Sequence, residues 1–346
     1  MHLLHFELLK PICPVCLLGG ASEARLRILH VERGDSTRIV EGALSCSSCK
    51  FEYPILDGIP LIMANVREVV RNQLPALLQR TDVSPYAASF LADCAGPDSV
   101  YERDRYRIGA YAHAHWADAP HGAGELSRAA LALAPAPNPS CIWLDVGCSL
   151  GRSAVELVRA GAGLVAALDL NLGMLRAFAD LLATGTVRYD LRRVGVVYDR
   201  REIAIELPAN IQERIAVWAC DATALPFAQG IAQGALSLNL IDCMAYPINH
   251  LSEVARVLDS GGHALIASPF DWSSVATPFE SWIGGHTQRG PLGGSSQAEL
   301  ERILGPQDPG NLGMRCVGTG ETEWAIHVHE RATMRYRTFL AAARKL

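Results

Sequence analysis

A chain of 346 residues is longer than one small domain and suits a domain of about 200 residues with an appendage. Hydrophobic residues make up 49% of it, enough for a sizeable core, while the net charge of −5 excludes a global attraction to nucleic acid or anionic lipid. No apolar run approaches the ~18 residues needed to span a bilayer and no basic leader precedes Glu7, so we expect a cytoplasmic protein with no membrane partner.

Residues 1–63 form the first predicted unit, which carries two Cys-x-x-Cys knuckles. Four thiolates at this spacing suit a tetrahedral structural zinc, whose binding would supply folding energy that so small a module cannot gain from a core. A pair of redox motifs is the alternative, but it needs a thioredoxin-like βαβ context that is missing. The predicted zinc ligands are Cys13, Cys16, Cys46 and Cys49.

The end of this unit, Phe51-Glu-Tyr-Pro-Ile-Leu-Asp-Gly-Ile-Pro-Leu-Ile62, carries a recognisable signature. It resembles a small zinc-ribbon family whose stand-alone members activate methyltransferases acting on tRNA, rRNA and a translation factor. The resemblance implies a ribbon fused to its enzyme. Basic and acidic side chains nearly balance over residues 1–60, which favours scaffolding of the catalytic domain over contact with nucleic acid.

Residues 64–134 are predicted to be a helical linker and lid, with helices at 65–80, 84–92 and 125–133. Residues 101–116 within it are dense in aromatic, His and Arg side chains. The Pro-rich stretch 134–140 then reads as a stiff connection into the next domain.

The stretch 141–154 reads as a short apolar strand at 142–146, a turn with two glycines, and a helix from Ser153. A second apolar strand at 164–168 ends in Asp169, which completes the start of a βαβ unit. Glycines allow the backbone to approach a ligand closely, and an acidic side chain at this strand end can accept hydrogen bonds from ribose hydroxyls. The pattern resembles the first motif of class I S-adenosylmethionine (SAM)-dependent methyltransferases, with Ser149 in place of the middle glycine.

Three further stretches follow in the order of that family: 220–227, 234–242 and 251–269. The resemblance covers roughly 140–346 and implies a methyltransferase domain over 135–346. Its fold class is α/β, a Rossmann-like seven-stranded and mostly parallel sheet with its last strand reversed. Its later strands are placed at 215–219, 235–240, 263–268, 314–319 and 334–342, with a helix at 296–304. The run 188–207 reads as an inserted β-hairpin, whose arginines form a solvated face or contact a substrate anion.

The same resemblance implies a SAM site at the carboxyl ends of the strands. Gly147 and Gly151 would admit the cofactor, and Asp145 would help to fix its amino-acid end. Asp169 would hold the ribose and Asp221 the adenine amino group. The full predicted set is Asp145, Gly147, Cys148, Ser149, Gly151, Asp169, Leu170, Asp221, Ala222 and Asn239, the last facing the methyl-transfer region.

In class I methyltransferases the segment before the first motif commonly lies over the cofactor and helps to form the acceptor pocket. The predicted substrate residues are Tyr106, Tyr111, Trp116, Trp272 and Trp282, and the candidate general bases are His113, His115, Asp242 and Tyr246. The stretch 268–285, with 239–242, resembles the mercaptohistidine N-methyltransferase domain of ovothiol biosynthesis. The alternatives are aromatic side chains that simply pack, and a structural lid shared by a wider family.

Three functions remain open at this point. The first is SAM-dependent methylation, most readily on nitrogen, of a small amino-acid-like or heteroaromatic metabolite, which the acidic pI favours. The second is methylation of RNA or protein with the ribbon as a docking or activating module, so nucleic acid is disfavoured as a partner without being excluded. The third is a SAM-binding regulator without catalysis.

Overall fold

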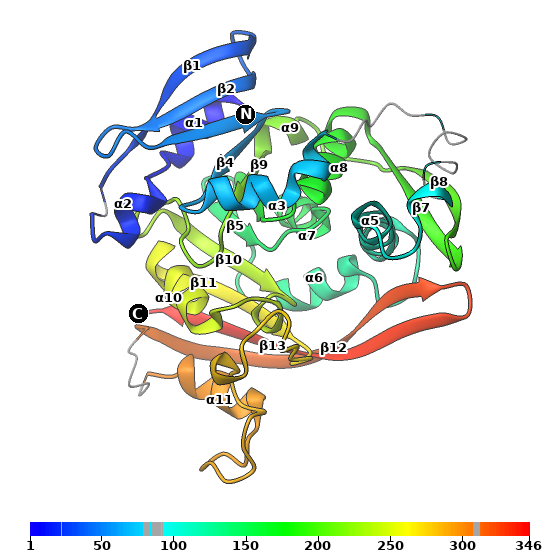
Figure 1. Cartoon of the computed structure of the whole chain (residues 1–346). Coiled ribbons are helices and arrows are strands. Elements are labelled where there is room, and N and C mark those ends of the chain that lie inside the picture. The colour runs from blue at the N-terminus through cyan, green and yellow to red at the C-terminus, as the bar shows by residue number, and fades with distance from the viewer. Residues whose placement is uncertain (22, 79–83, 85–90, 92, 307–311) are drawn as a thin grey trace.

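The computed structural model describes residues 1–21, 23–78, 84, 91, 93–306 and 312–346. The N-terminal unit contains helices α1 (Leu3–Leu9) and α2 (Pro14–Leu18) and strands β1 (Leu26–Gly34), β2 (Ile39–Cys46), β3 (Glu52–Leu56) and β4 (Ile59–Ile62). These strands lie at one end of the molecule (Figure 1). The region is the zinc ribbon that the sequence predicted.

The central sheet is built from β5 (Ile142–Val146), β6 (Leu164–Asp169), β9 (Ile215–Cys220), β10 (Ala232–Leu238), β11 (Leu258–Ser268), β12 (Met314–His329) and β13 (Ala332–Lys345). Their spatial order is β9-β6-β5-β10-β11-β13-β12, and β13 runs antiparallel to β11. The predicted α/β sheet with a reversed last strand is thus confirmed. The long β12–β13 hairpin forms the edge opposite the ribbon (Figure 1).

The prediction of a separate seven-stranded sheet is wrong in its strand count. Strand β4 pairs in parallel with β9, through Leu61 with Ala219 and Ile62 with Cys220. The ribbon and the central strands therefore form one 11-stranded sheet. Residues 59–62 contain no polar side chain, so a strand buried on both faces costs nothing in desolvated side chains.

Helices cover both faces of the central strands. They are α3 (Val66–Leu78), α5 (Val100–Trp116), α6 (Ala123–Leu131), α7 (Arg152–Arg159), α8 (Leu172–Thr184), α9 (Ile211–Arg214), α10 (Pro247–Val257) and α11 (Ser296–Ile303). The predicted helix at 84–92 lies, apart from residues 84 and 91, outside the described residues. No helix among the described residues is long and apolar enough to cross a membrane.

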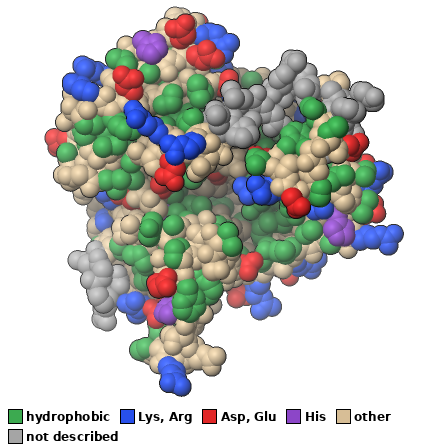
Figure 2. Space-filling model, in the orientation of Figure 1, with side chains coloured by type: hydrophobic (Ala, Val, Ile, Leu, Met, Phe, Trp, Pro, Cys, Tyr) green, Lys and Arg blue, Asp and Glu red, His purple; other side chains and the backbone are tan. Residues whose placement is uncertain are grey.

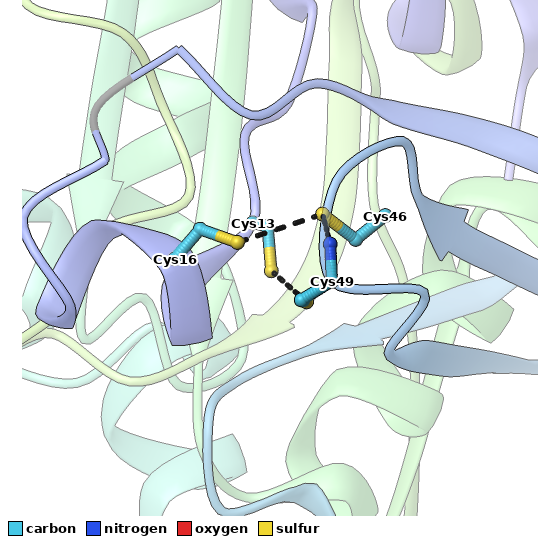
Figure 3. Close-up of side chains that lie close together, drawn as sticks. All are labelled: Cys13, Cys16, Cys46 and Cys49. Carbon is cyan, nitrogen blue, oxygen red and sulfur yellow. Dashed lines mark hydrogen bonds between the residues drawn. The ribbon is translucent and has the colours of Figure 1, made fainter.

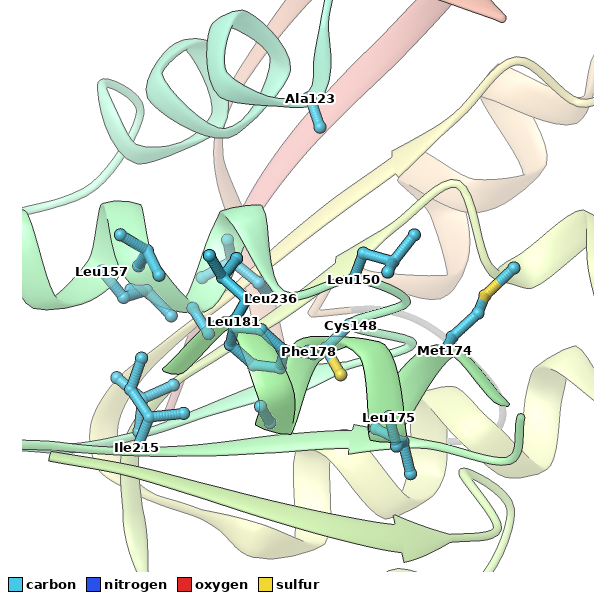
Figure 4. Close-up of a cluster of buried hydrophobic side chains, with 14 of the residues drawn as sticks. Ala123, Cys148, Leu150, Leu157, Met174, Leu175, Phe178, Leu181, Ile215 and Leu236 are labelled. Atoms are coloured by element: carbon cyan, nitrogen blue, oxygen red, sulfur yellow. The ribbon is translucent and has the colours of Figure 1, made fainter. Parts of the chain in front are cut away.

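Alternation along the strands divides the interior into two cores. Trp143 of β5 belongs to the core beneath α6, α7 and α8, whereas its neighbour Leu144 belongs to the core shared by the ribbon, α10 and α11. Phe178 and Leu181 of α8 and Leu236 of β10 all belong to the first core (Figure 4). Both cores pack against the glycine turn, because Cys148 and Leu150 are buried in the first core and Val146 in the second.

The predicted hairpin is present as β7 (Thr186–Val194) and β8 (Val197–Ala204), a separate two-stranded sheet. It packs against α5, where Gly109 lies so close to Asp190 that an added Cβ would be 1.9 Å from the Asp190 carbonyl oxygen. Arg105 of α5 also forms a 2.8 Å ion pair with Asp190. The hairpin thus fixes α5 in place, and α5 in turn forms a wall of the site described next.

Candidate active site and metal centre

The four ribbon cysteines form a compact cluster. Their sulfur atoms all lie within 4.8 Å of one another, and the Cys13–Cys49 and Cys16–Cys46 pairs are each 3.7 Å apart (Figure 3). Four sulfurs at about 2.3 Å from a zinc ion stand roughly 3.8 Å apart in a tetrahedron, so the cluster is compatible with a structural zinc. The backbone N–H groups of Ser48 and Cys49 donate to the Cys46 sulfur, which would stabilise its thiolate.

The glycine turn between β5 and α7 depends on left-handed backbone. Gly147, Ser149 and Gly151 have φ values of 80°, 51° and 73°. A Cβ at Gly151 would lie 2.1 Å from the Phe178 ring, and a Cβ at Gly147 would lie 3.1 Å from the Leu240 side chain. Ser149 therefore adopts the conformation that the missing middle glycine would favour. Its hydroxyl donates to the Met174 sulfur, 3.2 Å away.

The first N–H groups of α7 are satisfied from inside the protein. Arg152 N donates to Nδ1 of His115, and Ala154 N donates to the Asp145 carboxylate. Asp145 also accepts a 2.6 Å hydrogen bond from the Ser153 hydroxyl. Burial, and secondarily the nearby Asp169, raises the pKa of Asp145 to about 7. Asp145 therefore anchors the glycine turn to the helix that follows it.

Asp169 receives backbone donors at both carboxylate oxygens, from Ser149 and from Asn171, each at 2.8 Å. Burial raises its pKa, and these donors and Arg107 act in the opposite direction. At the end of the next strand, Asp221 accepts from the backbone and the hydroxyl of Thr223 through one oxygen only. Two carboxylates with remaining acceptor capacity thus stand at the carboxyl ends of β6 and β9.

A cavity of about 1430 Å³ opens along these strand ends. Five predicted cofactor residues line it: Gly147, Asp169, Leu170, Asp221 and Ala222. Tyr246, a predicted base, lines it as well. The surface is hollowed at the centre of the face shown in Figure 2. The cavity is too large for one cofactor alone, since small-ligand sites commonly measure ~300–1,000 Å³.

The carboxyl end of β10 holds polar atoms that lack partners. Asn239 has left-handed backbone, with φ at 53°, and its N–H donates to the Ala267 carbonyl. Its side-chain Oδ1 and Nδ2 are buried and have no hydrogen-bond partner among the described residues. Asp242 is 2% exposed, accepts from Asp271 N through Oδ2, and likewise leaves Oδ1 unpaired. Burial raises the pKa of this carboxyl, while hydrogen bonds from Asp271 N and the Ser268 hydroxyl act in the opposite direction.

Residues 144–266 match the family model of a methyltransferase domain. The chain contains a methyltransferase domain. The matched segment begins in β5 and ends in β11, so it includes the glycine turn, both cavity carboxylates and Asn239. No curated protein matches the chain.

Solved structures resemble this methyltransferase distantly. One is of SAM-dependent methyltransferases of Methanosarcina mazei (TM-score 0.39, 16% identity, covering 61% of this chain and 95% of that one). Another is the complex of the Trm112 methyltransferase activator of Haloferax volcanii with a protein described as a methyltransferase (0.42, 15%, 69% and 93%). A third is the [4+2]-cyclase SpnF (0.41, 14%, 67% and 85%). At TM-scores below 0.5, such likenesses establish neither substrate nor partner.

The methyltransferase uses SAM, and its residues fit that cofactor. The cavity is lined by Gly147, whose backbone a ligand can approach because no side chain is in the way, and by the carboxylates of Asp169 and Asp221. A carboxylate at each of two neighbouring strand ends suits the ribose and the adenine amino group. Ala222 is held in place by His250, whose Nδ1 lies 3.1 Å from the Ala222 carbonyl and whose Nε2 lies 2.8 Å from the Ser237 hydroxyl.

Not all the predicted site residues of the methyltransferase reach the cavity surface. Asp145 and Gly151 support the turn as described above, and Cys148 is buried beneath it. His115 is buried, and this lowers its pKa to about 3, so it stays neutral. His113 contacts Tyr189 of the hairpin at 3.1 Å instead. The roles predicted for these residues in binding or catalysis stay predictions.

The predicted substrate aromatics divide into two groups. Trp116 donates to the Leu150 carbonyl, and Tyr106 lies under the Arg192 guanidinium of the hairpin. Trp272 and Trp282 stack on each other 5.9 Å apart, with their N–H groups donating to Ser296 Oγ and the Thr277 carbonyl. Burial raises the pKa of Tyr111 to about 12, and the charges of Asp169 and Asp242 add to this effect.

Sequence reasoning missed several cavity residues. Arg38 and Asp57 come from the ribbon, Gln73 from α3, and Arg103 and Arg107 from the cavity side of α5. A signal was present only for the last two, because residues four apart share one face of a helix. The ribbon residues gave no signal, since their place depends on the pairing of β4 with β9.

Proposed function

We propose that this enzyme transfers the SAM methyl group to a nitrogen atom of a small amino-acid-like or heteroaromatic metabolite. The observation that carries the proposal is the set of unpaired buried atoms at the carboxyl end of β10: both side-chain atoms of Asn239 and Oδ1 of Asp242. Asn239 and Asp242 do not themselves line the cavity, but their neighbours Leu240 and Cys243 do. Buried polar atoms without partners cost free energy, and beside a cavity they commonly await a ligand. Two of these three atoms accept hydrogen bonds, which suits an N–H donor.

The chemistry follows from the ordinary requirements of methyl transfer. When bound, SAM supplies a methyl group already activated on a sulfonium, so the protein has to orient and desolvate the acceptor. Asn239 would orient the acceptor nitrogen through its unpaired amide. As that nitrogen forms its bond to the methyl carbon, the carbon–sulfur bond of the sulfonium would break, and its electron pair would stay on the sulfur of the departing thioether. The proton of the nitrogen would pass to Asp242 Oδ1. A raised carboxyl pKa brings Asp242 nearer to the pKa that a base needs at neutral pH.

The shape of the site supports a small acceptor over a macromolecule. The cavity is bounded by α5, α8, the β7–β8 hairpin and the ribbon residues Arg38 and Asp57. On the face that contains the hollow, Lys and Arg side chains are interspersed with Asp and Glu (Figure 2). An extended basic surface, which nucleic acid would require, is therefore not seen on that face. The ribbon would then act as a wall and scaffold of the site.

A ring nitrogen is the preferred acceptor atom within this class. The segment 268–285, on which the resemblance to mercaptohistidine N-methylation rests, begins beside Asp242, since Asp271 donates its N–H to that carboxylate. The stacked pair Trp272 and Trp282 then stiffens the segment. This would hold Asp242 in a fixed orientation toward a planar acceptor.

The test is transfer of a radiolabelled methyl group by zinc-loaded protein. One arm offers a metabolite pool that contains histidine-derived thiols, and the other offers total RNA and protein. We expect label in the small-molecule fraction, recovered as an N-methyl product. Label in the RNA or protein fraction would instead support the alternative, a macromolecular methyltransferase with the ribbon as docking module. SAM binding without transfer to either fraction would count against both and for a regulator.

A further inference from the structure

Helix α5 packs against the β7–β8 hairpin and also lines the cavity. On one face Glu102 accepts from Tyr198, Arg105 pairs with Asp190, and Gly109 touches the hairpin backbone. Arg103 and Arg107 project from a different side of the helix and line the cavity, to which Arg105 and Gly109 also contribute. The hairpin contacts fix the rotation of the helix about its axis. The cavity face is consequently presented in one orientation.

Most arginines that line the cavity already have a partner. The partnered ones are Arg38 with Gln212, Arg105 and Arg200 with Asp190, Arg176 with Asp57, and Arg188 with Glu202. Arg103 and Arg107 differ, because the side chain of neither forms a hydrogen bond or ion pair with any described residue. They stand one helical turn apart on the same face. Asp104 beside them lies beyond ion-pair distance of both.

Arg107 lies near enough to Asp169, the carboxylate predicted to hold the ribose, and to Tyr111 for its charge to act on both. Its charge acts on the carboxyl of Asp169 and on the hydroxyl of Tyr111, lowering the pKa of both against the larger effect of burial. Tyr111 in turn is close enough to Cys243 and Asp242 for their charges to raise its pKa. Arg107 is thus linked electrostatically to both ends of the methyl-transfer region.

Along α5, Arg107 lies about two turns from the residue that contacts the end of the glycine turn. His115 contacts that turn through Arg152 N, and eight residues of α-helix separate it from Arg107, a rise of ~12 Å. Arg103 lies a further turn away. The amino-acid end of SAM is expected beside the turn and α7, whereas Arg107 acts on Asp169 at the predicted ribose position, which favours a different anion as the partner of these arginines.

We propose that Arg107, with Arg103 behind it, binds a carboxylate of the methyl acceptor and so selects an anionic or zwitterionic small molecule. The inference rests on the proposed function, because it assumes that the acceptor is a metabolite. A guanidinium matches a carboxylate in two parallel hydrogen bonds, and the interaction strengthens in a cavity from which ligand excludes water. An amine or ring nitrogen of the same molecule would extend toward Asn239 and Asp242.

The first measurement tests carboxylate binding without any transfer. The variants are Arg107→Gln and the double variant R103Q/R107Q, and the matched control is Arg27→Gln on the exposed ribbon strand β1. Each protein is saturated with S-adenosylhomocysteine, and its thermal unfolding is followed in malonate and in neutral malonamide. We expect malonate to stabilise the wild type and R27Q more than malonamide does, and expect this difference to vanish in R107Q. Equal effects of malonate on the wild type and R107Q would overturn the proposal.

The second measurement separates the acceptor's carboxylate from that of the cofactor. Calorimetry compares S-adenosylhomocysteine with 5′-methylthioadenosine, which lacks the amino-acid end. We expect R107Q to bind both as the wild type does. A loss of about tenfold or more for S-adenosylhomocysteine alone would show that Arg107 holds the cofactor and would contradict the proposal.

A third measurement uses the labelled-methyl assay with the metabolite pool. The expected result for R107Q is a rise of about tenfold or more in the pool concentration needed for half-maximal transfer, with the maximal rate retained. An unchanged half-maximal concentration would count against the proposal. The proposed function fails separately, through the appearance of label in RNA or protein, whereas the malonate comparison stands without transfer.

Discussion

Leu61 of the zinc ribbon is the sheet partner of Ala219 in the methyltransferase domain. Two further contacts secure the same junction: Ile12 N donates to the Pro226 carbonyl at 2.9 Å, and Asp57 forms an ion pair with Arg176 of α8. Pro226 follows directly after the loop that carries Asp221. The ribbon is therefore continuous with the wall of the cavity, and we expect its folding to be coupled to that of the enzyme.

Loss of zinc should consequently destabilise the whole chain and not the ribbon alone. Metal binding to a four-cysteine site contributes on the order of 10 kcal/mol to folding, and the ribbon strands extend the central sheet. We expect Cys46→Ser, or chelation, to lower the unfolding temperature by roughly 10 °C or more in one transition. Calorimetry with Cys94→Ser, an exposed cysteine, is the control. A ribbon that melts separately, leaving the main transition unmoved, would contradict the coupling.

Gly151→Ala should disrupt the cofactor turn. The new Cβ would meet the Phe178 ring at 2.1 Å, and the backbone φ of 73° is unfavourable for alanine. Together these effects should cost about 3 kcal/mol or more and abolish SAM binding. Gly195→Ala is the matched control, because it also has positive φ, at 56°, but meets nothing within 4 Å. Urea unfolding measures both, and equal losses would indicate that backbone strain alone matters.

Asp169→Asn should weaken SAM binding in two ways. An asparagine keeps one acceptor oxygen, so it cannot accept from Ser149 N and Asn171 N together, and it removes the charge that favours ribose hydroxyl donors. We expect SAM affinity to fall by about tenfold or more, equivalent to ~1.4 kcal/mol. Calorimetric titration of SAM checks this, with the surface variant Asp259→Asn for comparison. Retained affinity would place the ribose elsewhere.

Asp145 should leave a distinct mark on the pH dependence of stability. Burial raises its pKa from 3.8 to about 7, so between these values the folded state holds a proton that the unfolded state has released. The contribution is fully present below about pH 4 and is lost as pH rises to about 7. Asp145→Asn removes this titration and keeps an acceptor for the Ser153 hydroxyl.

The measurement is urea unfolding of both proteins from pH 4.5 to 8. We expect the free energy of unfolding of D145N, relative to the wild type, to rise with pH by up to ~1.4 kcal/mol per pH unit. A relative stability that does not vary over this window would mean that Asp145 ionises in the folded protein as it does in the unfolded one.

Asp242→Asn tests the proposed base. The substitution preserves the size of the side chain and its acceptor for Asp271 N, but it removes the group that would receive the proton. We expect kcat to fall by about 10²–10⁴-fold with SAM affinity unchanged. The labelled-methyl assay and SAM titration measure these separately. Asp271→Asn serves as a comparison, since Asp271 accepts from Tyr336 and should affect the rate less. An unchanged kcat in D242N would exclude Asp242 as the base.

Parts of the structure followed from local patterns. The turn 147–151, the strand end at Asp169 and the knuckle Cys46-Ser-Ser-Cys49 each lie within a few residues of chain, where glycine, acidic and cysteine spacing dictates the geometry. The hairpin was likewise predictable, because its two alternating runs flank one polar turn. Such features need no information from distant segments.

What the sequence determined by itself was therefore the methyltransferase domain, the glycine turn and the four-cysteine cluster, all of which depend on short-range spacing. Only the tertiary structure decided that β4 adds to β9 and that α5 presents Arg107 to the cavity while it presents His113 to the hairpin. The physical reason is that sheet pairing and helix rotation are set by contacts between segments far apart in the chain. Local propensity does not encode these contacts.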